Sequence, residues 1–409
     1  MKTNRNYFYE FIFILALIFY TIDTTEVFGV RLFLVVAPFT LMYFFSRKIS
    51  KDFLITGTFL LLFSVTFSLI MYGHGYTGKG LIPVYLLFPF LAFIGGYFIS
   101  ETDKSYRKVY SIVFLFMIAT TGFIFLSYLQ TISVYGSLEN VTNVLGGRLI
   151  ASYWDVGSPI RATSMAVMLL FGLSLLPSVL VPTPKSKWFL GAKILTVVSF
   201  IASIIMALQV GSRTSVLLAV ISIIAYILFV GKFTLKKIYG VLSIALVGGI
   251  GRYLFNRDVF NMKTAYEETV IYERFQESGL QSARYDAWEQ VLTNFFAYPL
   301  GRREIDLKLG YAHNLWLDVV YDVGWIAGVL LIVFMVISLI VLLKFMKSNH
   351  PLYLKAIMLL VFVGFYIFFM TEPTLSGGQR VYFVLYTFFV GILVGLNKRI
   401  ILKENNYLN

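Results

Sequence analysis

Long apolar stretches recur along this chain, and they constrain its fold more than any other feature. Each stretch holds about 17 to 25 residues, which as a helix is enough to cross roughly 30 Å of hydrocarbon. Since 58% of the 409 residues are hydrophobic and only 13% are charged, a single water-facing core cannot hide this much apolar surface. The sequence therefore predicts an all-α polytopic membrane protein with the lipid bilayer as its surroundings.

The pattern predicts about twelve transmembrane helices, and an even number puts both chain ends on one side of the membrane. The first is predicted to be a retained helix, because no small-residue cleavage site of a signal peptide follows it. The predicted spans are 8–22, 27–45, 53–72, 81–99, 109–129, 162–181, 188–208, 214–230, 238–255, 315–343, 353–371 and 381–396.

Basic residues indicate which side is cytoplasmic. They gather at the termini and in every second loop, as the positive-inside rule requires for the cytoplasmic face. The net charge of +13 is therefore attributed to topology and lipid head groups, and no nucleic-acid partner is expected. These residues are Lys2, Arg5, Arg47, Lys48, Lys51, Lys104, Arg107, Lys108, Lys185, Lys187, Lys232, Lys236, Lys237, Lys344, Lys347, Lys398, Arg399 and Lys403.

Two long loops, 130–161 and 256–314, are predicted on the opposite, extracytoplasmic face, where they leave the only room for a catalytic or binding domain. In the second loop, Ser282 can cap a helix that Pro299 and Gly301 end. Its apolar positions recur at helical spacing, which predicts an amphipathic helix able to lie on the membrane surface. The apolar positions are Trp288, Val291, Leu292, Phe295 and Phe296, with Arg284, Asp286, Glu289 and Asn294 expected to turn away.

Arginine predominates among the basic residues predicted outside. A guanidinium grips phosphate or carboxylate at two points, so this bias indicates an anionic ligand, with phosphate the first candidate. The alternative is that these arginines snorkel or pair with outward acids such as Glu267 and Glu273. Arg213 fits that alternative less well, because it opens a span beside an uncharged apolar run. The outward set is Arg31, Arg148, Arg161, Arg213, Arg252, Arg257, Arg274, Arg284, Arg302, Arg303 and Arg380.

Three histidines are present, of which His74 and His313 are predicted to face outward while His350 lies in a cytoplasmic loop. A histidine can act as a general base near neutral pH, although an interfacial one is often structural. His313 stands out because Asn314, Asp318 and Asp322 follow it, the two aspartates one helical turn apart. These aspartates could instead pair with arginines and only hold the helix in place.

Several chemistries are excluded by the residues present. Cysteine is absent, which removes thiolate nucleophiles and disulfides. No metal-ligand cluster, phosphate-binding loop or serine-hydrolase motif occurs, so neither a metal site nor a cofactor is expected.

Several motifs together resemble the bacterial O-antigen polymerase and O-antigen ligase superfamily. One is Gly211-Ser212-Arg213-Thr214 at the start of a span. The others are Ala283-Arg284-Tyr285-Asp286-Ala287-Trp288, then Pro299-Leu300-Gly301, then His313-Asn314 with Asp322, Gly324 and Gly328. They cover the C-terminal half of the chain, and their order and spacing carry the resemblance.

The resemblance implies a GT-C-like membrane glycosyltransferase that works outside the bacterial cytoplasmic membrane on a glycan carried by undecaprenyl pyrophosphate. It implies no metal and no other cofactor. By the same resemblance, Arg213 and Arg284 would hold the pyrophosphate and His313 would be the base that activates the acceptor hydroxyl. Supporting roles are assigned to Asn314, Asp318, Asp322, Arg161 and Arg380.

Polymerase is favoured over ligase, because ligases of the superfamily often carry a second histidine before the His-Asn pair and an acid after it. Here the run is Tyr311-Ala312-His313-Asn314-Leu315, and Asp322 stands where glutamate is common. Expected partners are the lipid-linked oligosaccharide and, from the same pathway, a flippase and a chain-length regulator. The alternatives are an O-antigen ligase acting on lipid A core, an oligosaccharyltransferase, a lipid-linked oligosaccharide flippase and a non-catalytic assembly or sensor protein.

Overall fold

A computed structural model describes most of the chain, and its backbone falls into two compact units. The first contains Met1–Ala119, Ala283–Pro351 and Phe365–Asn409, and the second contains Thr120–Ser282 and Leu352–Gly364. The described residues are 2–22, 27–45, 49–102, 106–136, 140, 144, 149–157, 159–231, 283–375 and 379–408.

The described part is almost entirely helical, which confirms the predicted all-α polytopic membrane protein. Among the described residues, seven helices are long and apolar enough to cross a membrane, and three shorter apolar helices accompany them. The long ones are Lys51–Gly73, Ile82–Glu101, Arg107–Tyr135, Lys187–Gln209, Trp325–Lys347, Leu352–Thr371 and Arg380–Arg399, and the shorter ones are Phe8–Ile22, Gly29–Met42 and Arg213–Phe229.

Two predicted spans are interrupted. The segment 162–181 forms three short pieces, α8 (Ala162–Met168), α9 (Leu170–Ser174) and η3 (Leu176–Leu180). Pro177, which lacks a backbone N–H, lies in the last of them and cannot continue an α-helix there. The segment 315–343 is broken at Gly324, which has a φ of +86°. The predicted span 238–255 lies outside the described residues.

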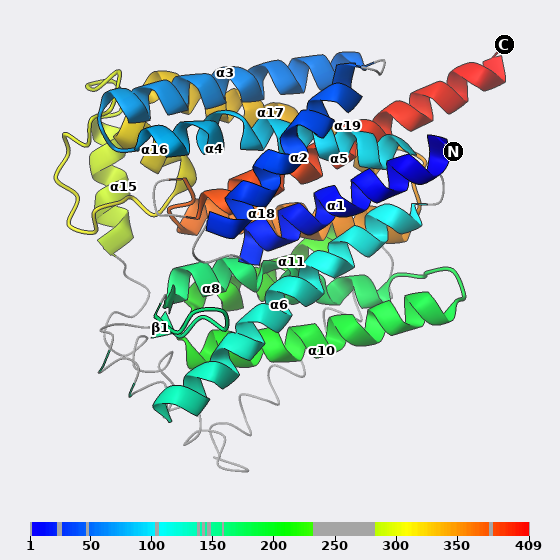
Figure 1. Ribbon diagram of the computed structural model, residues 1–409, viewed down its shortest axis with the longest axis horizontal. Coiled ribbons are helices and arrows are strands. Elements are labelled where there is room, and N and C mark those ends of the chain that lie inside the picture. Colours follow the sequence, from blue (N-terminus) through cyan, green and yellow to red (C-terminus); the bar gives the residue numbers. More distant parts are fainter. Residues whose placement is uncertain are drawn as a thin grey trace. The chain divides into compact units, whose positions relative to one another are not determined.

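The first unit is a bundle in which α5 and α19 pack most closely (Figure 1). Their backbones touch because glycines face the contact: a Cβ on Gly96 would strike the carbonyl of Phe388, and one on Gly391 would strike the carbonyl of Phe93. The helices of this unit are α1 (Lys2–Ile22), α2 (Val27–Phe45), α3 (Lys51–Gly73), η1 (Lys79–Leu81), α4 (Ile82–Leu86), α5 (Phe88–Thr102), the start of α6 (Arg107–Tyr135), α15 (Ala283–Thr293), α16 (Leu315–Val323), α17 (Trp325–Lys347), the end of α18 (Leu352–Thr371) and α19 (Arg380–Leu408).

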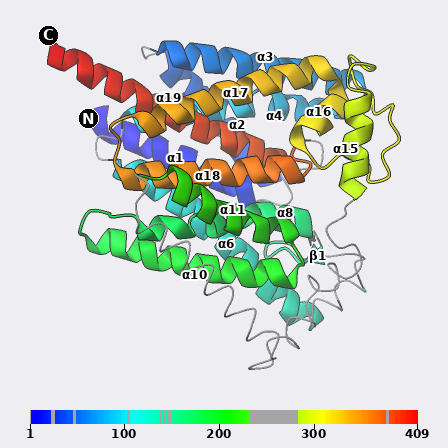
Figure 2. The same cartoon turned by 180° about the vertical axis from the view of Figure 1, so that it is seen from behind.

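The first unit has two chemically different ends. α1 begins and α19 ends at one end, while α15 and α16 lie at the other (Figures 1 and 2). Lysine ion pairs join the helix ends near the termini, such as Lys344 Nζ to Asp52 Oδ1 at 3.2 Å and Lys398 Nζ to Glu101 Oε1 at 2.6 Å. The arginines that belong to the candidate site lie with α15 and α16. Within this unit, these lysine ion pairs and the arginines of the candidate site therefore lie at opposite ends.

The second unit contains the rest of α6, the short pieces α8, α9 and η3, and the two helices α10 (Lys187–Gln209) and α11 (Arg213–Phe229). Its two short strands, β1 (Leu149–Ile150) and β2 (Ile160–Arg161), pair antiparallel with Leu149 opposite Arg161. The charge that the sequence places inside α10 has a partner, since Lys193 Nζ donates to the carbonyl of Val181 at 2.9 Å.

Candidate active site

The segment before α16 folds back onto the break between α16 and α17. A Cβ on Gly324 would overlap the carbonyl of Pro299, and one on Gly301, whose φ is +74°, would overlap the backbone of Asp322. Backbone hydrogen bonds close the contact: Arg302 N–H donates to the Asp322 carbonyl at 3.3 Å. The Pro299-Leu300-Gly301 motif and Gly324 are therefore two halves of one close backbone contact, which only glycine permits.

Asp322 stabilises this fold-back through an ion pair. Its Oδ1 accepts from Arg303 Nε at 2.7 Å, and its side chain is fully buried. The Arg303 guanidinium also lies over the Tyr76 ring, 4.2 Å from the centroid. Burial lowers the pKa of Arg303, but the charge and hydrogen bond of Asp322 outweigh burial and raise that pKa above its ordinary value. These contacts support the structural role that the sequence left open for Asp322.

Asp318 and Asn314 shape the turn that carries His313. Asp318 accepts the backbone N–H of Ala312 through Oδ1 at 2.7 Å and that of Asn314 through Oδ2 at 3.0 Å. Asn314 caps α16, where its Oδ1 accepts from the N–H of Trp316 at 3.1 Å. Burial and the nearby Asp322 raise the pKa of Asp318 to about 8, while the backbone N–H groups lower it. Both residues thus support the turn.

His313 is held at the apex of this turn in the left-handed region, with a φ of +55°. A histidine rarely adopts that conformation, and it persists where neighbours fix it. Here Trp288 Nε1 donates to the carbonyl of Ala312 at 2.6 Å, and Asn314 Nδ2 donates to the carbonyl of Met370 at 3.4 Å. The turn that carries His313 is therefore attached to α15 and α18, and the His313 side chain remains 19% exposed.

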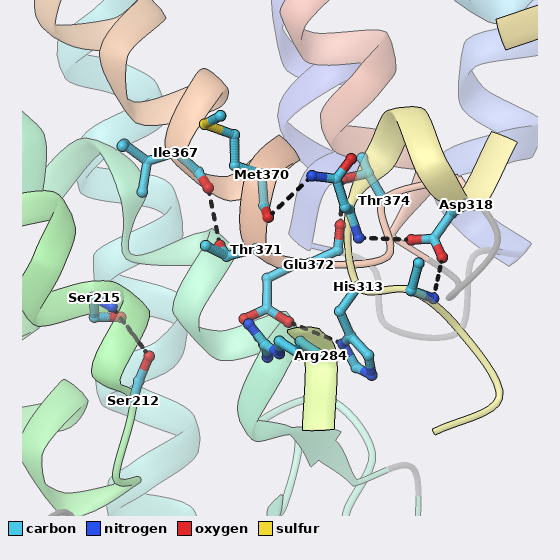
Figure 3. A network of polar contacts seen from close by, with 12 residues as sticks. Ser212, Ser215, Arg284, His313, Asp318, Ile367, Met370, Thr371, Glu372 and Thr374 are labelled. Carbon is cyan, nitrogen blue, oxygen red and sulfur yellow. Dashed lines mark hydrogen bonds and ion pairs between the residues drawn. The ribbon is translucent and has the colours of Figure 1, made fainter. Parts of the chain in front are cut away.

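Glu372, directly after α18, lies between Arg284 and His313 (Figure 3). Its Oε1 is 3.5 Å from Arg284 Nη2, and its Oε2 is 3.8 Å from His313 Nδ1. The Glu372 side chain is only 4% exposed, whereas that of Arg284 is 26% exposed. The structure therefore brings two of the predicted site residues together around a buried carboxylate.

The sequence prediction that Arg284 turns away from the apolar face of its helix is wrong. Arg284, Ala287, Trp288 and Val291 follow the spacing of a single helix face, and Ala287 and Val291 are buried in a cluster with the α16 segment. The apolar face of α15 therefore packs on protein, because the fold-back before α16 supplies an apolar partner. Leu292 and Phe296, which were expected on the same face, remain exposed.

Arg213 and Arg161 belong to the second unit. Arg213 opens α11, after Gly211 with a φ of +69° and Ser212, whose Oγ accepts the N–H of Ser215 at 3.3 Å (Figure 3). A capped helix N-terminus with an arginine in its first turn favours an anion. Arg161 is exposed at the start of α8.

Two further candidates in the first unit have identifiable partners. Arg380, at the start of α19, donates from Nη1 to the Tyr85 hydroxyl at 3.4 Å. His74 has its Nε2 at 2.7 Å from the carbonyl of Leu300, a geometry in which the ring donates to the fold-back. His74 therefore has a structural contact, which leaves His313 as the stronger candidate for a base.

Glu372 is the residue that the sequence interpretation missed. Its signal was present, because Glu372 and Arg380 are the charged residues between the apolar runs of α18 and α19. A carboxylate at the end of an apolar span raises the free energy of the folded protein unless a positively charged or hydrogen-bonding group pairs with it. Which partner it has depends on α15 and α16, which are distant in sequence.

Replacing Asp318 with asparagine is expected to loosen the His313 turn. The amide oxygen can still accept from one backbone N–H, but the NH2 group faces the other N–H and cannot accept from it. That buried N–H is left without a partner, which lowers the free energy of unfolding by about 1–3 kcal/mol. Thermal unfolding of the purified protein in detergent would measure the loss. Asp286→Asn, the same change at an exposed position of α15, should leave the unfolding temperature unchanged, and equal behaviour of the two variants would contradict the role of Asp318.

Comparison with known protein families gives a match within the C-terminal half of the chain and just before it. Residues 198–332 match the family model described as O-antigen ligase, a region that contains Arg213, Arg284 and His313 but not Glu372. No curated protein matches the chain. The match confirms the resemblance in the motifs, and the chain is therefore an integral membrane protein whose residues 198–332 belong to the O-antigen polymerase and ligase superfamily.

Proposed function

We propose that this protein is a membrane glycosyltransferase that polymerises glycan repeat units carried on undecaprenyl pyrophosphate, on the outer face of the bacterial cytoplasmic membrane. The observation that carries the proposal is the meeting of His313, Arg284 and Glu372 (Figure 3). An imidazole can act as the base that activates a hydroxyl, and a guanidinium can stabilise a leaving diphosphate.

In the proposed reaction, an acceptor hydroxyl attacks the anomeric carbon of the donor glycan. The new C–O bond forms as the bond from that carbon to the pyrophosphate breaks, so undecaprenyl pyrophosphate leaves with the bonding electrons. His313 takes the proton of the attacking hydroxyl as a general base. Its ring is partly exposed and fixed by the surrounding turn, so it is accessible to an acceptor.

The arginines stabilise the negative charge that develops on the leaving diphosphate. A guanidinium carries five N–H donors, so Arg284 can bind a phosphate while it keeps its contact with Glu372. Arg213 opens a capped helix, whose N-terminal dipole and arginine favour the same kind of anion. Arg380 and Arg161 are proposed to assist more weakly.

A second candidate is an O-antigen ligase, which transfers the finished glycan to lipid A core. The description of the matching family model favours it. The chemistry at His313 and the arginines would be the same, because only the acceptor differs. The product of the wild-type protein separates the two functions: a ladder of chain lengths on undecaprenyl pyrophosphate supports a polymerase, and glycan on lipid A core without a ladder supports a ligase.

Arg284→Ala and Arg213→Ala are each expected to lower the rate of undecaprenyl pyrophosphate release by about 10²-fold, because each removes a positively charged hydrogen-bond donor that stabilises the leaving diphosphate. The measurement uses purified protein in lipid nanodiscs with lipid-linked repeat units, read by gel and by release of the carrier lipid.

Arg284→Lys tests whether the planar fork matters, since lysine keeps the charge but binds only as a point charge. The matched control is Arg302→Lys, at an exposed position outside the proposed site. Normal chain growth in both alanine variants would exclude the proposed pyrophosphate site. Movement of repeat units across the membrane without any glycosyl transfer would instead favour a flippase.

A further inference from the structure

We infer that Glu372 is a positioning residue, which orients the imidazole of His313 and links it to the pyrophosphate-binding Arg284. The inference rests on the proposed function, because it assigns His313 as the base. Glu372 lies outside the residues that match the family model, so this role comes from the structure of the chain itself.

The first support is the position of the two carboxylate oxygens. Oε1 lies on the side of Arg284, at 3.5 Å from Nη2, and Oε2 lies on the side of His313, at 3.8 Å from Nδ1 (Figure 3). Among the residues that the structure describes, no hydrogen-bond partner reaches the buried Nδ1 of His313. The carboxylate of Glu372 is therefore the acid placed to accept from that nitrogen.

The second support is how firmly the backbone near Glu372 is held against the histidine turn. Glu372 N–H donates to the carbonyl of Phe368 at 2.8 Å, and Thr374 Oγ1 donates to the carbonyl of Glu372 at 3.3 Å. Two residues before Glu372, in the last turn of α18, the Met370 carbonyl accepts from Asn314 Nδ2. The end of α18 is thus attached to the residue next to His313, so the backbones that carry the carboxylate and the imidazole are held close together.

The third support is energetic. A carboxylate that is only 4% exposed has lost most of its hydration, and the loss is tolerated where charged and hydrogen-bonding partners replace water. Arg284 supplies a positive charge on one side. An imidazole that is protonated during the reaction supplies a second one on the other side, so the site suits the charged form of His313.

The arrangement decides which nitrogen of His313 does the chemistry. When Nδ1–H points at Glu372, the lone pair lies on Nε2, and that nitrogen is the one available to an acceptor hydroxyl. The acquired proton then resides on Nε2, and Glu372 stabilises the imidazolium without taking the proton itself. The distance of 3.8 Å needs to shorten by about 1 Å, a change that is common when substrate completes an active site.

The shared carboxylate also couples the base to the donor. A phosphate that binds the other N–H groups of Arg284 draws part of the guanidinium's positive charge away from Glu372, although the ion pair persists. More of the carboxylate's negative charge is then available to His313. Binding of the lipid-linked donor is therefore expected to strengthen the Glu372–His313 contact at the moment when the base is needed.

The test compares steady-state kinetics of Glu372→Gln and Glu372→Asp with the wild-type protein in nanodiscs, using lipid-linked repeat units. Loss of a residue that orients a catalytic side chain lowers the rate by about 10 to 100-fold. We expect that fall in kcat for Glu372→Gln, a change in KM below about 3-fold, and partial recovery in Glu372→Asp, which retains the charge. His313→Ala combined with Glu372→Gln should be no slower than His313→Ala alone, because the carboxylate acts through the ring.

Two controls make the same chemical change elsewhere. Glu101→Gln removes a carboxylate that pairs with Lys398, and Glu289→Gln changes an exposed residue of α15. Both should keep the wild-type kcat. A wild-type kcat in Glu372→Gln would overturn the inference, and so would a fall in kcat that tracks a lower unfolding temperature. If His313→Ala is inactive in the same experiment, the proposed function stands even then, whereas an active His313→Ala overturns the proposed function itself.

Discussion

His313→Ala is expected to lower the rate of glycan polymerisation by about 10²–10⁴-fold, the range that a general base contributes. The turn that carries this residue should survive, because Asp318 and Asn314 hold it through backbone N–H groups and the cap of α16. The strain that alanine relieves at this left-handed backbone position has a small effect beside the loss of the proton acceptor. Because His313 acts on the acceptor hydroxyl, KM for the donor should change little. Single-turnover assays with preloaded donor would measure the chemical step directly.

His74→Gln is the matched control for that experiment. Glutamine can still donate to the carbonyl of Leu300, which the His74 ring meets at 2.7 Å. Activity should therefore remain near the wild-type level. If His74→Gln were inactive and His313→Ala active, the base would be assigned to the wrong histidine.

Gly324→Ala is expected to cost about 2–6 kcal/mol of folding free energy. Holding a residue with a side chain at a φ of +86° accounts for about 1–3 kcal/mol of this, and the overlap of the new Cβ with the Pro299 carbonyl adds about 1–3 kcal/mol. The close contact between the fold-back and the α16–α17 break would open. The Arg303–Asp322 ion pair, which lies at that contact, should loosen with it. The unfolding temperature in detergent and the yield of monodisperse protein measure the effect.

Gly122→Ala is the matched control, since a Cβ at Gly122 in α6 would meet nothing within 4 Å. Alanine suits a helix interior better than glycine, so this variant should be as stable as the wild-type protein or slightly more so. Equal stability of Gly324→Ala and the wild-type protein would show that the backbone contact at Pro299 is not needed for the fold.

Much of the local structure could be predicted from sequence, because it depends on neighbours along the chain. Apolar runs of spanning length predicted where most membrane helices lie, and the cap at Asn314 follows from an asparagine before an apolar helix. One prediction failed because the break depends on a distant partner. The break at Gly324 is stabilised by Pro299, and nothing within the apolar run 315–343 reveals that contact.

The same reasoning explains the errors in α15. Helical spacing showed that one face is apolar but not what covers it. A membrane surface and a protein partner present the same apolar character, so the pattern could not separate them. The structure supplies the α16 segment as the partner, and that choice turns Arg284 toward Glu372 and away from solvent.

The sequence by itself determined that lipid surrounds this chain, that lysine and arginine are distributed unequally, and that His313, Arg284 and Arg213 are the residues to examine. These features are local or compositional, and they are readable without a fold. Only the tertiary structure decided that a buried carboxylate, Glu372, lies between His313 and Arg284. The reason is physical: burial removes a charge from water, and the partners that replace water come from α15 and the turn before α16, far from Glu372 in the sequence.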